Sequence, residues 1–523
     1  MKILDTSLLV TDEQLSALSP NETYWVYNGL DCCITEEIRG KLDSLLDDVT
    51  RPLYEHTIRM QAPILAMMMR GIKVNETHRK VALSEAGIEK QRLLDILQRL
   101  MTEGLGLEGP FNPGSPKQVK WFFYDYLGLK VIKARNTQGF YTPSTGREAL
   151  EKLSQYFIAQ PFVHLILAIR DQNKMMGFLK TPTDPDGRIR CSLNLAGTNT
   201  GRLSSSFSDF GTGTNLQNVD SNLRYMFVAD PGMVFVNIDL EQADSRNVGA
   251  LCWDQFYESY GEKFAGSYLD ACESGDLHTT VCRMGWRNLD WPDDRKFWRA
   301  IADGNAYRTY SYRDMAKKLG HGTNYLGQPA TMSQHTKIPT AQIVDFQSNY
   351  FGAFPVIPEW HTKTINTLQS TGQLTHLFGR RKSFFGRLDD QNVINAAIAY
   401  CPQGMTGEEI NHGMLRLWQH PLMDLLIQVH DSILFQVPVN QVNELVPLAL
   451  ELLEAPITLK GDRRFMVPLE AETGYNWGKP KFDKDGRITS NPLGLMKWKG
   501  EETRKPPRPT RKKLITLREA LDK

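Results

Sequence analysis

The sequence contains no run of eighteen apolar residues, the length that a membrane-spanning helix needs. Its seven cysteines form no C-x-x-C pair, and Cys32 and Cys33 are adjacent, so neither a disulfide framework nor a zinc site is indicated. The first residues, MKILDTSLLVTDEQ, lack the apolar core of a signal peptide. These absences predict a soluble protein without a membrane partner and with reduced thiols. We expect it in the cytoplasm, or in the host cytoplasm if the protein is viral.

The chain also lacks a strong charge of either sign. Its 61 Lys and Arg residues nearly balance 60 Asp and Glu residues, which leaves a net charge of +1. Bulk electrostatics therefore cannot attract a nucleic acid, and any such affinity must come from a locally basic groove. With 523 residues, of which 41% are hydrophobic, the chain is long enough for two to four domains or subdomains.

Two short hydrophobic runs each end in an aspartate: Met233 to Asp239 and Leu425 to Asp431. Bounded runs of Val, Ile, Leu and Phe predict buried strands, and a carboxylate at the end of a buried strand needs a partner. Either Asp alone also fits an ordinary strand end before a turn. Polar neighbours such as Gln242, Asp244 and His430 favour a site instead. If the two strands are adjacent, the carboxylates suit Mg²⁺, with phosphates completing its shell, and thus phosphoryl or nucleotidyl transfer.

A third segment predicts a helix with a polar stripe. Residues four apart lie on one face of a helix and here extend for about 18 Å, a length that suits a triphosphate followed by a base. A solvated basic helix is the alternative. Gly320 and Gly322 argue against it, because glycine in an exposed helix is costly and suggests a close approach of something to the backbone. The stripe consists of Arg313, Lys317, His321 and Tyr325.

These three segments resemble motifs A, C and B of the family A DNA polymerases, which include polymerase-I-like and bacteriophage replicative enzymes. Motif A of that family has an Asp, an acidic residue five positions on and an Arg two beyond, here Asp239, Asp244 and Arg246. Motif C usually reads His-Asp-Glu, whereas this chain has His430-Asp431-Ser432 and lacks the third acidic group. His321 stands where the family usually has Phe or Tyr.

Weaker matches follow in family order over residues 196 to 478. The resemblance implies that polar side chains near the duplex test base-pair geometry in the minor groove, where acceptors recur in every pair. It assigns DNA contacts to Arg202, Asn215, Gln217, Arg246, Gln403 and His430, and nucleotide contacts to Gln242, Asp244, His278, Arg313, Lys317, His321 and Tyr325.

Around residue 115 the pattern predicts a helix start, with Ser115 as N-cap and Pro116 at the first helical position. A helix N-terminus that carries Lys117 is suited to bind phosphate. An ordinary capped helix is the simpler interpretation. The segment also resembles the thumb tip of the family, which implies that Lys117 contacts the DNA backbone.

The implied fold is α+β, a right-hand polymerase with an antiparallel-sheet palm, a helical thumb and helical fingers. Strands near 374–387 and 425–438 are expected to complete the palm, and a long amphipathic helix is expected from Glu85 to Leu105. The expected divisions are 1–50, the end of an exonuclease domain; 51–190, thumb with connecting palm segments; 191–252, palm; 253–375, fingers; 376–487, palm; and 488–523, a flexible basic tail containing RKPPRPTRKK.

Tyr27 and Asp31 resemble the last motif of the 3′–5′ exonuclease domain that precedes the polymerase in this family. The other exonuclease carboxylates are missing from this sequence, and one aspartate cannot form a two-metal site. We therefore expect no exonuclease activity from this chain alone. Residues 1–50 are either a degenerate docking piece under the palm or a segment that completes the site of a separate exonuclease-bearing polypeptide.

The implied function is template-directed DNA synthesis, in which dNTPs are added to the primer of a primer-template DNA with two Mg²⁺ ions held by Asp239 and Asp431. Lys317 is the expected proton donor to the leaving group. Asp244 is expected beneath the ribose, where it disfavours a 2′-hydroxyl. The alternatives are a single-subunit RNA polymerase or primase and a catalytically silent DNA-binding replisome subunit.

Overall fold

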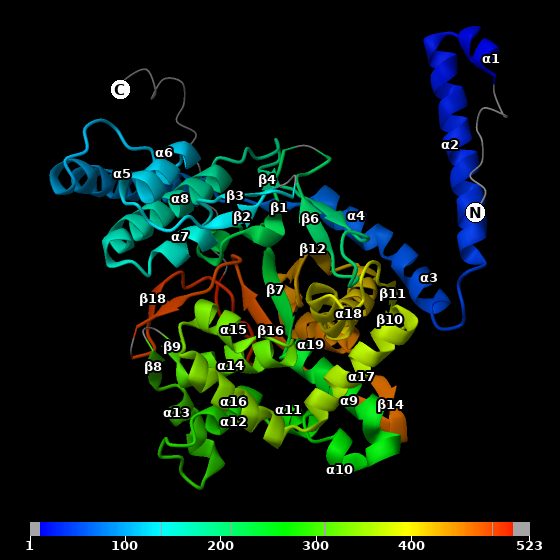
Figure 1. The fold of residues 1–523 in the computed structure, drawn as a ribbon. Coiled ribbons are helices and arrows are strands. Elements are labelled where there is room, and N and C mark those ends of the chain that lie inside the picture. The colour runs from blue at the N-terminus through cyan, green and yellow to red at the C-terminus, as the bar shows by residue number, and fades with distance from the viewer. Residues whose placement is uncertain (1–10, 137–138, 211, 308–309, 484, 506–523) are drawn as a thin grey trace. The chain divides into compact units, whose positions relative to one another are not determined.

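The computed structural model describes residues 11–136, 139–210, 212–307, 310–483 and 485–505 (Figure 1). The chain forms two compact units, each built from segments that are distant in sequence. Unit 1 contains residues 1–61, 244–408 and 459–461, and unit 2 contains residues 62–243, 409–458 and 462–523.

The centre of unit 2 is a five-stranded antiparallel sheet in the order β12-β13-β7-β16-β19. Its middle strand β7 buries Val234, Phe235, Val236 and Ile238 completely. Consecutive buried residues point to opposite faces of a strand, so both faces of β7 are covered. The strands are β7 (Met233–Leu240), β12 (Asp424–Val429), β13 (Ser432–Pro438), β16 (Leu469–Gly474) and β19 (Met496–Lys497).

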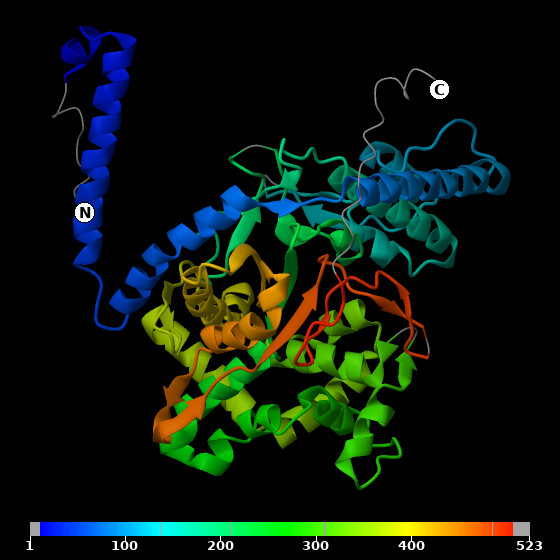
Figure 2. The same cartoon turned by 180° about the vertical axis from the view of Figure 1, so that it is seen from behind.

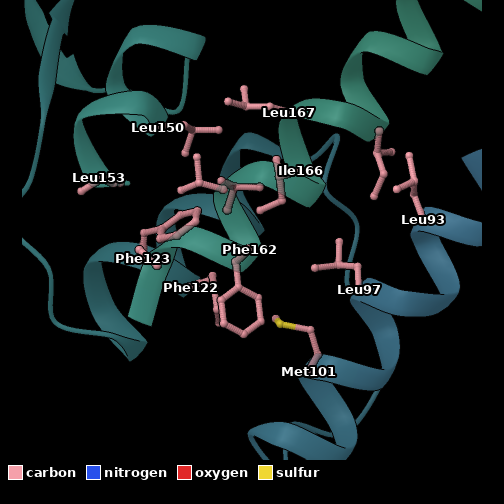
Figure 3. Packing of buried hydrophobic residues seen from close by; sticks show 14 residues of the cluster. Leu93, Leu97, Met101, Phe122, Phe123, Leu150, Leu153, Phe162, Ile166 and Leu167 are labelled. Atoms are coloured by element: carbon pink, nitrogen blue, oxygen red, sulfur yellow. The ribbon is translucent and has the colours of Figure 1, made fainter. Parts of the chain in front are cut away.

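A helical part of unit 2 has its own apolar core, in which aromatic and aliphatic side chains from four helices interdigitate (Figure 3). The long helix is α5 (Glu76–Arg99), which starts at an Asn75 N-cap and continues as a π-helical segment to Gly104. It therefore begins nine residues before the expected Glu85. The Ser115 cap is confirmed, since its side chain accepts from the Gln118 N–H. The other helices are α6 (Pro116–Lys120), α7 (Arg147–Leu153) and α8 (Gln160–Leu179).

The remaining elements of unit 2 are short strands and two connecting helices. Small antiparallel pairs join β1 to β4, β2 to β3, β5 to β6 and β17 to β18. The two helices are α4 (Gln61–Arg70) and α19 (Val442–Leu453). The short strands are β1 (Ile72–Lys73), β2 (Lys133–Arg135), β3 (Tyr141–Pro143), β4 (Arg188–Ile189), β5 (Ser192–Asn194), β6 (Ser204–Ser206), β14 (Ile457–Leu459), β15 (Arg463–Phe465), β17 (Lys481–Phe482) and β18 (Ile488–Ser490).

Unit 1 is mostly helical. Helix α14 (Tyr312–Asn324) carries the polar stripe and begins with a capping box between Ser311 and Asp314. The other helices are α1 (Asp12–Ser16), α2 (Pro20–Asp43), α3 (Arg51–Arg59), α9 (Ala243–Tyr260), α10 (Glu262–Ala265), α11 (Leu269–Glu273), α12 (Leu277–Gly285), α13 (Trp298–Ala302), α15 (Pro329–Thr336), α16 (Thr340–Ala353), α17 (Val356–Thr371) and most of α18 (Gln391–Trp418).

Two hairpins complete unit 1, β8 (Asn305–Tyr307) with β9 (Tyr310–Ser311) and β10 (Gln373–Thr375) with β11 (Arg381–Ser383). The expectation that strands near 374–387 join the palm sheet is wrong, because among the described strands β10 pairs with β11 alone. The loop of residues 376–380, in which Gly379 has a φ of +87°, returns the chain from β10 directly to β11 and pairs the two strands locally.

The expectation of a flexible tail from 488 is wrong for residues 488–505. β18 pairs with β17, β19 adds an edge strand beside β16, and the red end of the described chain runs beside that strand in Figure 2. Most of RKPPRPTRKK falls in 506–523, outside the described residues. No helix within the described ranges combines the length and apolar character needed to cross a membrane.

Candidate active site

The two aspartates predicted from the hydrophobic runs are brought together in unit 2. Strands β12 and β13 form a hairpin with only His430 and Asp431 in its turn, and Ser432 pairs directly with Asp239 of β7. The Leu240 N–H donates to the Asp431 carbonyl at 3.1 Å. His430 has a left-handed φ of +55°, an unfavourable conformation for a side chain of this size, so the sheet holds a strained turn beside the carboxylates.

The electrostatics of this pair favour a cation. Burial raises the pKa of the Asp239 carboxyl, and the nearby Asp431 and Glu472 carboxylates raise it further. A buried like-charge pair becomes stable as two carboxylates only when a positive group lies between or beside them.

Two further carboxylates, Glu470 and Glu472, lie on β16 and were missed by the sequence analysis. Glu470 pairs in register with Asp239, and Glu472 with Asn237, so all four side chains share one face of the sheet. Each glutamate has a lysine partner, Lys497 at 2.6 Å and Lys479 at 2.7 Å respectively. The alternation Leu-Glu-Ala-Glu-Thr indicated a strand with an acidic face, but nothing in it identified β7 as the neighbour.

A cavity of about 1020 Å³ opens at these residues. Asp239 and Asp431 line it together with the start of α5, residues 221–225 and the chain that follows β16. No cluster of three or more His, Cys, Asp or Glu with metal-site geometry is present in the described ranges. Two hard oxygen donors in an open cavity nevertheless fit Mg²⁺, which keeps waters and substrate phosphates in its shell.

The predicted stripe on α14 forms a second cluster, in unit 1. Arg313 donates two hydrogen bonds to Asp276, at 2.7 and 2.9 Å, while Lys317 and His321 are exposed. The ring of His321 meets that of Tyr325 edge to face at 4.8 Å. Arg313, Lys317 and His321 thus lie on α14, and Tyr325 follows as its C-cap.

The close approach expected at the α14 glycines comes from the protein itself. A Cβ on Gly320 would lie 3.5 Å from Val281 of α12, and one on Gly322 would lie 2.7 Å from Met332 of α15. The glycines therefore indicate helix packing on two sides of α14, against α12 and against α15.

His278 lies on α12 and is buried, with 9% exposure. Burial, followed by the charges of Arg313 and Lys317, lowers its pKa to about 4. The imidazole is therefore neutral near pH 7. It can donate a hydrogen bond to a phosphate but brings no positive charge.

Three other candidates lie in unit 1. Asp244 accepts a hydrogen bond from the Thr406 hydroxyl at 2.9 Å, and the same hydroxyl accepts one from Asn247 at 3.1 Å. Arg246 is 6% exposed, near Cys272, whose pKa its charge lowers against a larger effect of burial. Gln403 is half-buried on α18, one residue after Pro402.

The DNA-contact candidates of unit 2 are partly engaged by the protein. Gln217 donates to the Gln428 carbonyl at 2.9 Å, two residues before His430, and Asn215 donates to the Ser205 carbonyl at 2.6 Å. These bonds link the β5–β6 hairpin and the 215–218 turn to the strand that carries Asp431. Arg202 is half-buried and Lys117 is exposed on α6.

Three candidates have unusual surroundings. Gln242 follows β7 with a left-handed φ of +56°, and its side-chain oxygen has no hydrogen-bond partner among the described residues. Tyr27 and Asp31 are both exposed on α2, a 24-residue helix in which no described side chain is buried.

An antiparallel sheet bearing paired carboxylates, with separate helical subdomains, defines a mixed α+β polymerase domain. A solved structure supports this fold class: the POL domain of Pol1 from M. smegmatis, described as a complex with DNA primer-template and dNTP, superimposes with a TM-score of 0.64. The match has 23% sequence identity and covers 80% of this chain and 69% of that one.

The chain belongs to DNA polymerase family A, whose sequence profile matches residues 83–285 and 299–479. DNA polymerase I of Deinococcus radiodurans is 28% identical over 473 residues, which are 85% of this chain and 44% of that protein. The thermostable DNA polymerase I of Thermus filiformis is 29% identical over 468 residues, 85% of this chain and 49% of the relative. The chain thus spans about half the length of these relatives.

Proposed function

We propose that this chain synthesises DNA on a template, adding deoxynucleotides to the 3′-hydroxyl of a primer. The observation that supports the proposal most directly is the pairing of Ser432 with Asp239, which sets the Asp431 turn against the end of β7. Family membership over residues 83–285 and 299–479 adds the reaction class.

Asp239 and Asp431 would hold two Mg²⁺ ions, which lower the pKa of the primer hydroxyl and neutralise charge on the departing pyrophosphate. The carboxylates fix where this charge is supplied, because the hairpin and the sheet leave them little freedom. In the transfer the primer oxygen forms a bond to the α-phosphorus as the bond to pyrophosphate breaks.

The side chains of α14 and α12 suit the nucleotide. Lys317 has an exposed ammonium that can bind the β- and γ-phosphates and return a proton to the leaving oxygen. Neutral His278 donates a hydrogen bond, and His321 and Tyr325 offer ring surfaces to sugar and base. Arg313 joins them when phosphate oxygens replace those of Asp276.

Primer extension with Mg²⁺ tests the proposal. The wild type is expected to extend a primer with dNTPs, and Asp239→Asn or Asp431→Asn to lose at least about a thousandfold in rate while DNA binding changes little. A wild type that binds primer-template without extending it would establish the silent replisome subunit instead.

The same assay with ribonucleotides tests the sugar contact that we propose for Asp244. Wild type is expected to prefer dNTPs strongly, and Asp244→Ala to weaken that preference. Equal use of rNTPs by both proteins would favour the RNA polymerase or primase.

We further propose a replicative role in a bacteriophage. The low identity to bacterial DNA polymerase I and the three segments outside the family profile, 1–82, 286–298 and 480 onwards, support a specialised enzyme. Locating the gene tests this: neighbouring phage replication genes support the role, and a bacterial housekeeping locus contradicts it. The site of action would be the host cytoplasm.

The exposed aromatic residues of α2 support a protein partner for that helix. Tyr24, Trp25 and Tyr27 are 73%, 71% and 63% exposed. We propose that they dock a separate exonuclease-bearing polypeptide, whose site Tyr27 and Asp31 complete. Excision of a mismatched primer by the mixture should exceed that of either protein alone and fall with Asp31→Ala; no gain on mixing removes the idea.

A further inference from the structure

Residues 480–505 lie beyond the family profile, yet one strand of this segment, β19, belongs to the sheet that carries the candidate active site. The β17–β18 hairpin leads into β19, which pairs Lys497 with Glu472 and Met496 with Thr473. This segment therefore covers an edge that β16 would otherwise expose.

The end of the segment is fixed by a buried ion pair. Arg504 donates to Glu502 at 2.6 Å and to the carbonyls of Gly494 and Thr473, both also at 2.6 Å. The Thr473 hydroxyl donates to Glu502 at 2.7 Å, and the Glu502 side chain is only 3% exposed. These bonds to Thr473 of β16 would be lost if the segment were released, and they hold its end against the sheet.

The fixed segment forms one wall of the active-site cavity. Lys479, Pro480, Lys481 and residues 490–493 line the same 1020 Å³ space as Asp239 and Asp431. The charged side chains around this space are five carboxylates and three cations, and the wall supplies two of the cations. The carboxylates belong to Glu85, Asp239, Asp431, Glu470 and Glu472, and the cations to Arg224, Lys479 and Lys481.

The three cations differ in what engages them. Arg224 lies over the Trp477 ring at 4.5 Å, and Lys479 is paired with Glu472 at 2.7 Å. Lys481 is exposed and makes no ion pair with any residue in the described part of the chain. Lys481 is therefore the cation that the wall itself offers to an anionic ligand, while the charge of Arg224 is not neutralised by its ring contact.

We propose that residues 479–493 are a primer-binding wall, in which Lys481 contacts a backbone phosphate of the primer strand close to its 3′ end. The proposal rests on the polymerase function proposed above. A polyphosphate backbone suits the wall because the cavity is large enough for more than one nucleotide and the wall adds a single unpaired charge, matching one phosphodiester. The incoming triphosphate carries several charges and is the competing ligand.

Equilibrium binding of a labelled primer-template, measured in EDTA over a range of KCl concentrations, tests the contact without catalysis. Each phosphate neutralised contributes about −0.9 to the slope of log K against log salt. Lys481→Ala is expected to reduce the slope by about 0.9 in magnitude and to raise the KM for primer-template several-fold. The kcat at saturating DNA and the KM for dNTP should stay unchanged.

Lys499→Ala is the matched control, because Lys499 is an exposed lysine of the same segment that does not line the cavity. Lys481→Arg should retain the wild-type slope. If Lys481→Ala and Lys499→Ala give the same slope, or if only the KM for dNTP rises, the primer contact is refuted. Failure of the wild type to extend any primer would instead refute the polymerase function, while the slopes would still report the contact.

Discussion

Asp239 in unit 2 and Asp276 in unit 1 are both partly buried aspartates next to chain segments that the family motifs identify, yet their surroundings are opposite. Asp239 is near Asp431 and Glu472, and burial together with these charges raises its pKa. Asp276 loses solvent too, but hydrogen bonds from Arg313 and Thr279 outweigh that effect and hold its pKa well below the usual range. Burial thus raises the pKa of both carboxyls, and the neighbouring groups decide whether the pKa lies above or below its ordinary value.

The difference shows which of the two carboxylates is paired with a cation of the protein itself. Asp276 caps α12 and binds Arg313 of α14, so it fastens together the helices that carry His278 and Lys317. Asp239 has no comparable cation on its own strand. The carboxylate of Asp276 therefore stabilises the packing of two helices. The charged form of Asp239 instead lowers the stability of the fold, and a bound cation removes that cost.

The largest expected effect tests that cost. The pKa of Asp239 rises from its ordinary value to about 7 in the folded protein, so folded wild type binds an extra proton between about pH 4 and about 7 and loses stability as the pH rises through that window. Asp239→Asn should abolish this slope and raise the free energy of unfolding at pH 8 in EDTA by about 2–4 kcal/mol. Urea unfolding at several pH values measures it.

Adding Mg²⁺ should reverse the order, because the ion binds folded wild type and not the variant. Asp125→Asn, at an exposed position of unit 2, provides the control and should leave the pH profile unchanged. If Asp239→Asn is less stable than wild type in EDTA across the range, the like-charge account is wrong.

The second prediction concerns Asp276, whose replacement should lower the free energy of unfolding instead of raising it. Asp276→Ala removes the α12 cap and the partner of Arg313, and should lower stability by about 2 kcal/mol. Because the folded pKa is depressed, the loss should be constant above about pH 5 and shrink as the pH falls below about 4, the ordinary value for Asp.

Asp294→Ala is the comparison for this measurement. Asp294 also caps a helical turn and pairs with a lysine, Lys296, but both side chains are about half exposed or more. It should cost under about 1 kcal/mol. Equal losses from Asp276→Ala and Asp294→Ala would show that the Arg313 pair adds nothing.

The contrast also separates what a sequence can predict from what it cannot. The β7 and β12 runs could be identified because apolar residues in short bounded runs are a local signal, and the α14 stripe because its spacing is local too. The low pKa of His278 could not, since it arises from burial of the ring in the fold and from the charges of Arg313 and Lys317, more than thirty residues away. The same holds for Glu470 and Glu472. The sequence predicts their strand, but the pairing of that strand with β7 depends on the fold.

The smallest expected effect concerns the packing that holds the Asp276–Arg313 pair. Gly320 lies inside α14, where a Cβ would make an ordinary 3.5 Å contact with Val281, so Gly320→Ala should stabilise the protein by about 0.5–1 kcal/mol through helix propensity. Gly322→Ala, one half-turn on, would meet the Met332 methyl at 2.7 Å and should gain less or nothing, since that side chain must move. Thermal unfolding of both variants at pH 7 and pH 4 decides this. A loss on Gly320→Ala would mean that α12 and α14 lie closer than the Val281 contact indicates, and the Asp276–Arg313 geometry would have to be reconsidered with it.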